Sequence, residues 1–196
     1  MKESAEHQFF GSSFGVGTVI LDAVAKGCKK IIIGLGGSAT NDGGMGLLQS
    51  LGARFYDMNH KYLSPQAMNL EKIRYIDLNR LNKLEGIELI AACDVKNHLL
   101  GENGATYVFG KQKGFFPNQI KKVDMAMQNY RDQLYRYTHV DIDTFEGGGA
   151  AGGIGAVLIG ILQAKMIPGI ELLMSYSDIE DQIQDCDLVI TGEGQS

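Results

Sequence analysis

Hydrophobic positions in the first third of the chain predict a helix, a strand and then a glycine-rich loop. The spacing i, i+3, i+4, i+7, i+8, which forms one face of an amphipathic helix, is occupied by Val16, Val19, Ile20, Ala23 and Val24. The apolar run at 29–35 (KKIIIGL) is typical of a short strand buried on both faces. The loop at 36–44 (GGSATNDGG) therefore follows directly from the end of a predicted buried strand.

Two further segments complete a predicted βαβ-type unit. Residues 45–51 (MGLLQSL) predict a short helix that ends at Gly52, and residues 53–57 (ARFYD) alternate as in a strand. With residues 29–35 they give the order strand, loop, helix, strand.

The rest of the chain predicts more strands around one long helix. Strands are predicted at 73–78, 87–93 and 187–190, and the strongest helical pattern covers 117–137. Ser177 and Glu180 have the spacing of a capping box, which marks a helix start. We therefore predict an α/β fold, a mixed sheet containing a βαβ unit with flanking helices.

The two ends of the chain carry expectations about domain organisation. Residues 1–12 are expected to be a leader that need not be ordered, and residues 13–196 the folded part. The sequence stops in the glycine loop TGEGQS just after a predicted strand, where an α/β protein normally begins its next helix. We therefore expect a fragment, or a chain that another segment completes.

Composition and charge narrow the possible partners. The 18 Lys and Arg against 23 Asp and Glu give a net charge of −5, with no basic block, so neither nucleic acid nor an anionic membrane is an expected partner. The three cysteines are widely spaced and no signal peptide opens the chain, which favours the cytoplasm. The uncharged run at 147–164 contains seven glycines and predicts a buried helix entered through a loop, not a membrane span.

Glycine is the unusual feature of the composition. The chain has 26, against a typical frequency of about 7%, and half of them fall in the windows 34–46 and 147–160. A glycine loop between a strand and a helix gathers backbone N–H groups that bind phosphate. The candidate phosphate-binding residues are Gly36, Gly37, Ser38, Thr40, Asn41 and Gly43.

Asp42 gives this loop a second possible role. A carboxylate beside a phosphate site repels its ligand unless a cation intervenes, so Asp42 indicates either Mg²⁺ binding or proton transfer. A purely structural interpretation stays open, in which Ser38 or Asn41 caps the next helix and Asp42 accepts backbone N–H bonds.

Other known motifs fit less well. No Walker A sequence occurs, which excludes a P-loop NTPase, and no G-x-S-x-G elbow is present. The pattern Gly34-x-Gly36-x-x-Ala39, with Asp57 after the next strand, matches the loose nicotinamide dinucleotide fingerprint. In that fingerprint the helix begins within the glycines, whereas here residues 40–44 intervene. A nicotinamide-dependent oxidoreductase and a non-catalytic module therefore remain the alternatives.

Five motifs, in order along the chain, resemble the bacterial glycerate kinase family of the type that phosphorylates D-glycerate with ATP. They lie at 13–28, 31–57 (IIIGLGGSATNDGGMGLLQSLGARFYD), 92–114 (ACDVKNHLLGENGATYVFGKQKG), 147–158 (GGGAAGGIGAVL) and 187–196 (DLVITGEGQS). The resemblance implies a two-domain α/β kinase with its active site in a cleft, of which this chain resembles the middle portion.

The resemblance also implies roles for particular residues. ATP and Mg²⁺ would be the cofactors and D-glycerate the small-molecule substrate, with 2-phosphoglycerate the favoured product. Either Asp42 or Asp94 would activate the glycerate hydroxyl, and Asp94 with Glu193 would hold Mg²⁺. Asn97 and Lys113 would contact substrate, Lys113 through a carboxylate or phosphate group.

Overall fold

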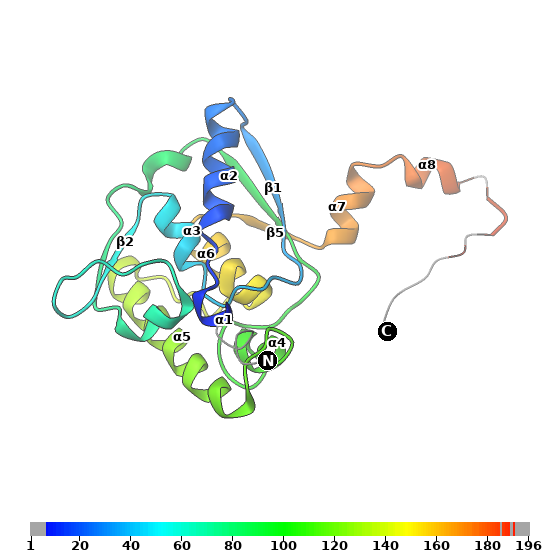
Figure 1. Ribbon diagram of the computed structural model, residues 1–196. Coiled ribbons are helices and arrows are strands. Elements are labelled where there is room, and N and C mark those ends of the chain that lie inside the picture. The colour runs from blue at the N-terminus through cyan, green and yellow to red at the C-terminus, as the bar shows by residue number, and fades with distance from the viewer. Residues whose placement is uncertain (1–6, 185, 189, 191–196) are drawn as a thin grey trace.

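A computed structural model describes residues 7–184, 186–188 and 190. Figure 1 shows a main body in which helices surround a small sheet, and an arm of two short helices that extends away from it. The sheet has three parallel strands in the order β1-β4-β5, namely β1 (Lys30–Gly34), β4 (Glu88–Ala92) and β5 (Lys165–Ile167). The predicted α/β class with flanking helices is confirmed.

The helices cover this sheet and connect its strands. Parallel neighbours require crossover connections, and the long segments from β1 to β4 and from β4 to β5 provide them. The helices of the body are α1 (His7–Phe10), α2 (Phe14–Ala25), α3 (Met45–Ser50), α4 (Ala105–Phe109), α5 (Pro117–Thr138) and α6 (Ile154–Gly160), with 3₁₀ turns at Ala67–Lys72, Leu81–Leu84 and Ala150–Gly153.

Residues 53–57 do not join the same sheet as residues 29–35. They form β2 (Arg54–Tyr56), which pairs antiparallel with β3 (Tyr75–Asp77) in a separate two-stranded ribbon. The predicted βαβ unit of residues 29–57 is therefore wrong, since the parallel partner of β1 is β4 and not β2. Local alternation can predict a strand, but it carries no information on its partner.

The strand β1 is less buried than its three isoleucines predict. Exposure alternates along it, and Ile32 is 42% exposed. In the described sheet β1 pairs with β4 alone, so its other edge has no strand beside it. The central strand β4, by contrast, buries Leu89, Ile90 and Ala91.

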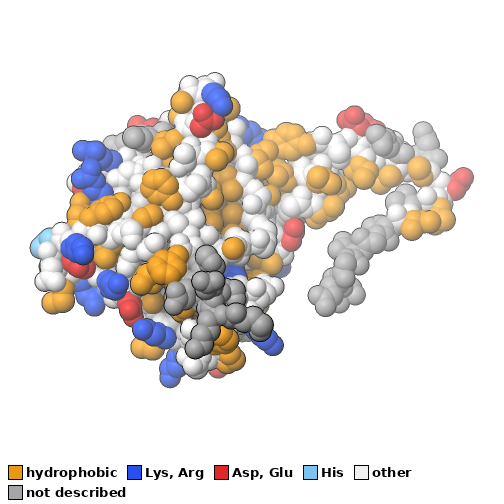
Figure 2. Space-filling view, viewed as in Figure 1, with side chains coloured by type: hydrophobic (Ala, Val, Ile, Leu, Met, Phe, Trp, Pro, Cys, Tyr) orange, Lys and Arg blue, Asp and Glu red, His pale blue; other side chains and the backbone are white. Residues whose placement is uncertain are grey.

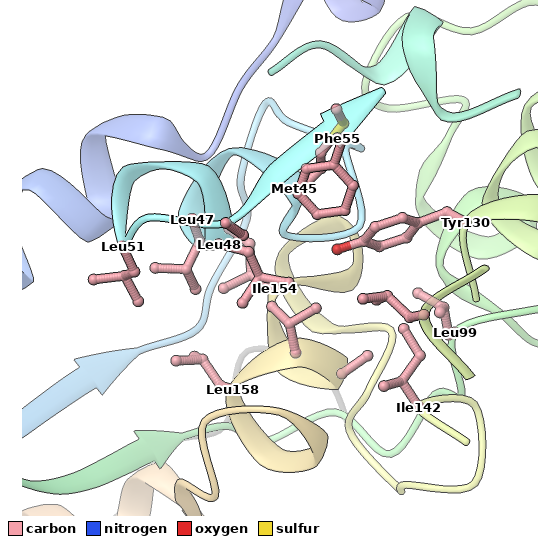
Figure 3. Close-up of a cluster of buried hydrophobic side chains, with 14 of the residues drawn as sticks. Met45, Leu47, Leu48, Leu51, Phe55, Leu99, Tyr130, Ile142, Ile154 and Leu158 are labelled. Carbon is pink, nitrogen blue, oxygen red and sulfur yellow. The ribbon is translucent and has the colours of Figure 1, made fainter. Parts of the chain in front are cut away.

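The main core lies between α3, α5, α6 and the sheet. Figure 3 shows core side chains from α3, α5, α6 and the ribbon strand β2, with Tyr130 of α5 reaching toward the helix that carries Leu47 and Leu48. Leu47, Leu48, Met127 and Tyr130 have no exposed surface. The predicted helix at 117–137 is confirmed as α5, although Tyr137 at its end is 44% exposed.

The glycine-rich run at 147–164 forms a loop and the buried helix α6, as predicted. In the described part of the chain, no helix is both long and apolar enough to cross a membrane.

The C-terminal part differs from expectation. The arm consists of α7 (Gly169–Ser175) and α8 (Ile179–Ile183), and α8 begins after Asp178 without a side-chain capping bond, so the predicted Ser177–Glu180 capping box is wrong. Residues 187, 188 and 190 are not in a strand, and Leu188 is 76% exposed. Glu193 lies outside the described residues.

Residues 7–12 are the described part of the predicted leader. They contain α1, and the ring of Phe9 packs edge-on against Phe115 at a centroid separation of 5.2 Å.

Candidate functional site

A pocket of about 660 Å³ lies at the carboxyl ends of β1 and β4. This is the edge at which open parallel sheets bind ligands. Four segments of the chain line it: the loop after β1, the residues directly after β4, the end of α4 with the turn that follows it, and the second glycine loop before α6. The lining residues are Leu35, Gly36, Gly37, Ser38, Ala39, Asp94, Val95, Phe109, Gln112, Lys113, Ala150 and Ala151.

The first glycine loop presents a run of unused backbone donors. No acceptor within the described chain is recorded for the amides of residues 36–41. At Gly36 and Gly37 a Cβ atom would meet nothing within 4 Å, so these residues face open space. Of the predicted phosphate-binding residues, Gly36, Gly37 and Ser38 line the pocket. Their backbone amides have no acceptor within the described chain, as a phosphate site would require.

The other end of the first glycine loop, at residues 41–43, makes hydrogen bonds within the protein. The amide of Gly43 donates to the carbonyl oxygen of Gly152 at 3.0 Å, and Gly43 is buried against Tyr130 and Met127. Asn41 is fully buried and donates from Nδ2 to Thr106 Oγ1 at 3.0 Å. The prediction that Gly43 and Asn41 face a phosphate is therefore wrong.

Thr40 occupies the boundary between these halves. Its hydroxyl lies 3.3 Å from Ser38 Oγ, and its carbonyl oxygen accepts a hydrogen bond from Lys113 Nζ at 2.6 Å. Thr40 does not line the pocket, so it contributes through the contacts it makes with Ser38 and Lys113.

Asp42 points into the protein and not toward the pocket. It has no exposed surface, and Oδ2 accepts hydrogen bonds from Ser13 N at 2.7 Å, Ser13 Oγ at 2.8 Å and Gly46 N at 3.1 Å. Oδ1 accepts one from Gly44 N at 3.1 Å. Burial raises the pKa of Asp42, and these four hydrogen bonds oppose that rise. The expectation that Asp42 lies beside the phosphate site is therefore wrong. Its contacts agree with the structural interpretation, in which Asp42 accepts backbone N–H bonds.

Lys113 gives the pocket a positive charge. Its side chain is half-buried between the two glycine loops, held by the carbonyl oxygen of Thr40. An added Cβ on Gly152 would lie 2.7 Å from Lys113 Nζ, which shows how closely the second loop approaches it. Burial lowers the pKa of Lys113 to about 8, so an anion in the pocket would stabilise its charged form.

Asp94 lines the same pocket from the end of β4. Its side chain is exposed, and Oδ1 accepts a hydrogen bond from the amide of Gly169 at 2.7 Å. Among the described residues that line the pocket it is the only carboxylate. Searching the described residues finds no cluster of three or more His, Cys, Asp or Glu that could hold a metal ion.

Asn97 does not reach the pocket. Its Nδ2 donates to the carbonyl oxygen of Asn103 at 2.9 Å, and its own carbonyl oxygen accepts from Gly149 N at 2.8 Å. Through these two hydrogen bonds Asn97 ties the loop after β4 to the second glycine loop.

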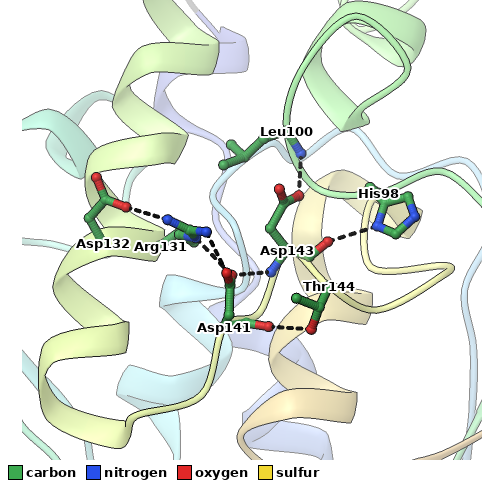
Figure 4. A network of polar contacts seen from close by, with 7 residues as sticks. All are labelled: His98, Leu100, Arg131, Asp132, Asp141, Asp143 and Thr144. Carbon is green, nitrogen blue, oxygen red and sulfur yellow. Dashed lines mark hydrogen bonds and ion pairs between the residues drawn. The ribbon is translucent and has the colours of Figure 1, made fainter.

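A polar network holds the segment before the second glycine loop (Figure 4). Arg131 of α5 pairs with Asp141 and Asp132, and Arg131 lowers the pKa of Asp141. Asp143 accepts a hydrogen bond from Leu100 N at 2.9 Å, and its carbonyl oxygen lies 2.7 Å from His98 Nδ1. These contacts hold the loop after β4 against the segment that precedes the second glycine loop.

Several residues of the site were not singled out from the sequence, although they lie inside the motifs that carry the family resemblance. Ser13 fixes Asp42, and Phe109, Gln112, Ala150 and Ala151 line the pocket. The sequence pointed to Ala150 and Ala151 only indirectly, because they lie within the second glycine cluster at 147–160. The contacts of Ser13 join residues 29 positions apart, so no local pattern reports them.

The fold and pocket define an α/β protein with a pocket at the carboxyl ends of parallel strands, lined by backbone amides and by the Lys113 side chain. The sequence matches the glycerate kinase family over residues 1–196. It is 42% identical to a glycerate kinase of Bacillus cereus over 92% of this chain and 48% of that protein, and 42% identical to a glycerate 2-kinase of Escherichia coli over 94% and 49%.

A solved structure agrees with this assignment. The crystal structure of a candidate glycerate kinase 2 from Salmonella typhimurium LT2 superposes with a TM-score of 0.86 at 42% identity, covering 96% of this chain and 50% of that one. The chain belongs to the glycerate kinase family. It spans about half the length of the curated relatives it matches.

Proposed function

We propose that this chain binds D-glycerate and the phosphates of ATP and takes part in phosphorylation of the glycerate hydroxyl, with 2-phosphoglycerate the favoured product. The observation that carries the proposal is the convergence, in one pocket, of the donors at 36–38, the Lys113 ammonium group and the Asp94 carboxylate. The relatives named glycerate kinase and glycerate 2-kinase supply the substrate class.

The backbone amides and Lys113 would each offset part of the negative charge of the two ligands. Phosphoryl transfer depends mainly on positioning and on offsetting charge, because little covalent chemistry falls to the protein. The unused amides of Gly36, Gly37 and Ser38 would hold phosphate oxygens. Lys113 would pair with the glycerate carboxylate, aligning the hydroxyl with the phosphorus.

Asp94 is the residue we propose to hold Mg²⁺. The ion prefers carboxylate oxygens, retains several waters, and commonly needs only one or two protein carboxylates beside substrate phosphates. Asp94 fits this demand, since it is exposed in the pocket and its Oδ2 has no recorded hydrogen-bond donor within the described chain. When bound, Mg²⁺ would neutralise charge on the nucleotide phosphates.

The nicotinamide alternative is not supported by the loop geometry. A dinucleotide fingerprint requires a helix that begins within the glycines, at Gly36. Here α3 begins at Met45 and is preceded by Asp42, whose carboxylate caps the first turn from within the protein. The loop therefore ends at a buried carboxylate and not at a pyrophosphate site.

For an ATP-dependent kinase we propose the cytoplasm as the location.

The first test measures binding and turnover in the same chain. Calorimetry with D-glycerate and with MgATP, together with a coupled assay for ADP release, should detect both ligands. A chain that binds neither would be a non-catalytic module, and binding of NAD alone would restore the oxidoreductase interpretation.

The second test assigns Lys113. Lys113→Met should weaken glycerate binding on the order of 10- to 100-fold, the loss expected for one charge-assisted hydrogen bond, and should affect MgATP far less. Lys111→Met is the matched control, since Lys111 lies two residues away in the same loop but is exposed and outside the pocket. Equal losses for both ligands in Lys113→Met would contradict a role at the glycerate carboxylate.

A further inference from the structure

Asp42 is a buried acidic residue whose contacts favour its charged form. Its two oxygens accept four hydrogen bonds, two from Ser13, one from the amide of Gly44 and one from the amide of Gly46. A carboxylate only accepts hydrogen bonds, whereas the protonated acid would bring a further hydrogen into a site already filled with donors. Burial raises the pKa of Asp42, and these four donors oppose that rise, so the carboxylate is the form that fits the site.

Lys113 lies against the peptide segment that leads to Asp42. Its Nζ donates to the carbonyl oxygen of Thr40 at 2.6 Å, two residues before Asp42. A Cβ atom placed on Gly152 would lie 2.7 Å from Lys113 Nζ and 2.9 Å from the Cα of Asn41, so the ammonium group is close to residues 40 and 41 together. The buried carboxylate therefore belongs to the residue immediately after the segment that the ammonium group contacts.

The charge of Asp42 acts on Lys113 through the protein and not through water. Asp42 has no exposed surface, so solvent ions do not screen its charge as they would on the surface. Burial of Lys113 lowers its pKa to about 8, and the Asp42 charge opposes that fall. Without a negative charge at Asp42, the ammonium group would therefore lose its proton at a lower pH.

The other titratable groups around this pair are exposed or neutral. Asp94 lines the pocket from the end of β4, but its side chain is exposed to water, which weakens its effect on the ammonium group. Residues 147–153 of the second glycine loop contain no titratable side chain, and Lys111 is exposed. Tyr130 of α5 is buried beside the first glycine loop, and burial followed by the Asp42 charge raises the pKa of its phenol well above the ordinary value, so it stays neutral.

We propose that Asp42 is a positioning residue that acts through Lys113, because its buried negative charge keeps the Lys113 ammonium group charged and able to pair with the glycerate carboxylate. This inference rests on the proposed function, and adds to it a residue that lies outside the pocket. A purely structural role, in which Asp42 only anchors the beginnings of α2 and α3, makes a different prediction. Its substitution would then change stability and leave the proton affinity of Lys113 as it was.

The test compares Asp42→Asn, which removes the charge, with Ser13→Ala, which removes a hydroxyl bound to Asp42 Oδ2 and keeps the charge. NMR of the Lys113 Cε atom in the lysine-labelled chain follows its protonation without ligand, and calorimetry follows glycerate affinity, both from pH 5.5 to 9.5. The Lys113 signal is assigned by its loss in Lys113→Met. In Asp42→Asn both midpoints should fall by about one pH unit or more, which makes glycerate binding about tenfold weaker at pH 9. Ser13→Ala should keep the midpoint of about 8.

A second measurement needs no substitution at Asp42. NMR of the Asp42 carboxyl carbon in the unchanged chain reports its protonation, and a protonated acid at neutral pH would overturn the inference even if Asp42→Asn did not fold. An unchanged Lys113 midpoint in Asp42→Asn would also overturn it, while glycerate binding by the unchanged chain keeps the proposed function. If the unchanged chain binds neither glycerate nor MgATP, the proposed function fails, and a lower Lys113 midpoint in Asp42→Asn still supports the coupling between the two residues.

Discussion

At the scale of single residues, burial makes the protonation of Lys113 depend on whether an anionic ligand is bound. Its ammonium group is half-buried and holds the Thr40 carbonyl oxygen at 2.6 Å. Burial lowers its pKa to about 8, because the charged form loses water that the protein only partly replaces. An anion that pairs with it must raise that pKa again.

This shift predicts a pH dependence for glycerate binding. Below pH 8 Lys113 is protonated and affinity should be nearly constant. Above pH 8 it loses its proton, so the dissociation constant should rise, by up to about tenfold per pH unit. Calorimetry from pH 6.5 to 9.5 measures the effect, with Lys111→Met as the control that retains it. A profile that stays flat to pH 9.5 would place the Lys113 charge outside the binding site.

At the scale of elements, Asp42 and Ser13 join the beginnings of two helices. Ser13 precedes α2, and its hydroxyl both donates to Asp42 Oδ2 and accepts a hydrogen bond from Leu47 N of α3 at 2.9 Å. The backbone amides of Gly44 and Gly46 also donate to Asp42. This set of contacts anchors the far end of the first glycine loop, which leaves its first residues free to face the pocket.

Substitution of Ser13 should therefore cost stability. Ser13→Ala removes two buried hydrogen bonds and leaves the Leu47 amide without its acceptor, which should lower the free energy of unfolding by about 1–3 kcal/mol. Thr18→Ala, which removes an exposed hydroxyl from the same helix, should change it by less than about 0.5 kcal/mol. Urea unfolding measures both. A loss in Ser13→Ala no larger than that of the control would show that the two helices are not joined through this hydroxyl.

At the scale of the whole molecule, the arm exposes apolar side chains and buries few of them. Figure 2 shows hydrophobic side chains along α7 and α8. The exposed fraction is 59% for Ile170, 64% for Leu173 and 62% for Tyr176. The described residues of α7 include none that is buried. The stability of the body should therefore depend little on the arm.

A pair of leucine substitutions tests this division. Leu158→Ala in α6 removes a fully buried side chain and should lower the free energy of unfolding by about 2–5 kcal/mol. Leu173→Ala in α7 should change it by less than about 0.5 kcal/mol, because that side chain is already in water. Equal losses in calorimetric unfolding would mean that the arm packs against the body in solution.

Sequence patterns predicted those features whose physical cause is local. The amphipathic spacing of Ile120, Val123, Met127, Tyr130 and Leu134 recovered α5, since its buried face repeats every three to four residues. The run at 87–93 recovered β4, and the loop predicted from residue 36 does follow β1. The charges of Lys113 and Asp94 were expected at the site, and both line the pocket.

Tertiary structure decided everything that depends on contacts between distant segments. Whether Asp42 meets a ligand or Ser13, 29 residues earlier, is set by how α2 packs on α3, and spacing along the chain carries no record of it. The same holds for the partner of β1, for the inward turn of Asn41 and for the approach of Ala151 to the pocket. A local pattern fixes conformation and amphipathic faces, whereas the direction in which a polar side chain points is chosen by whichever buried donors the folded chain brings to it.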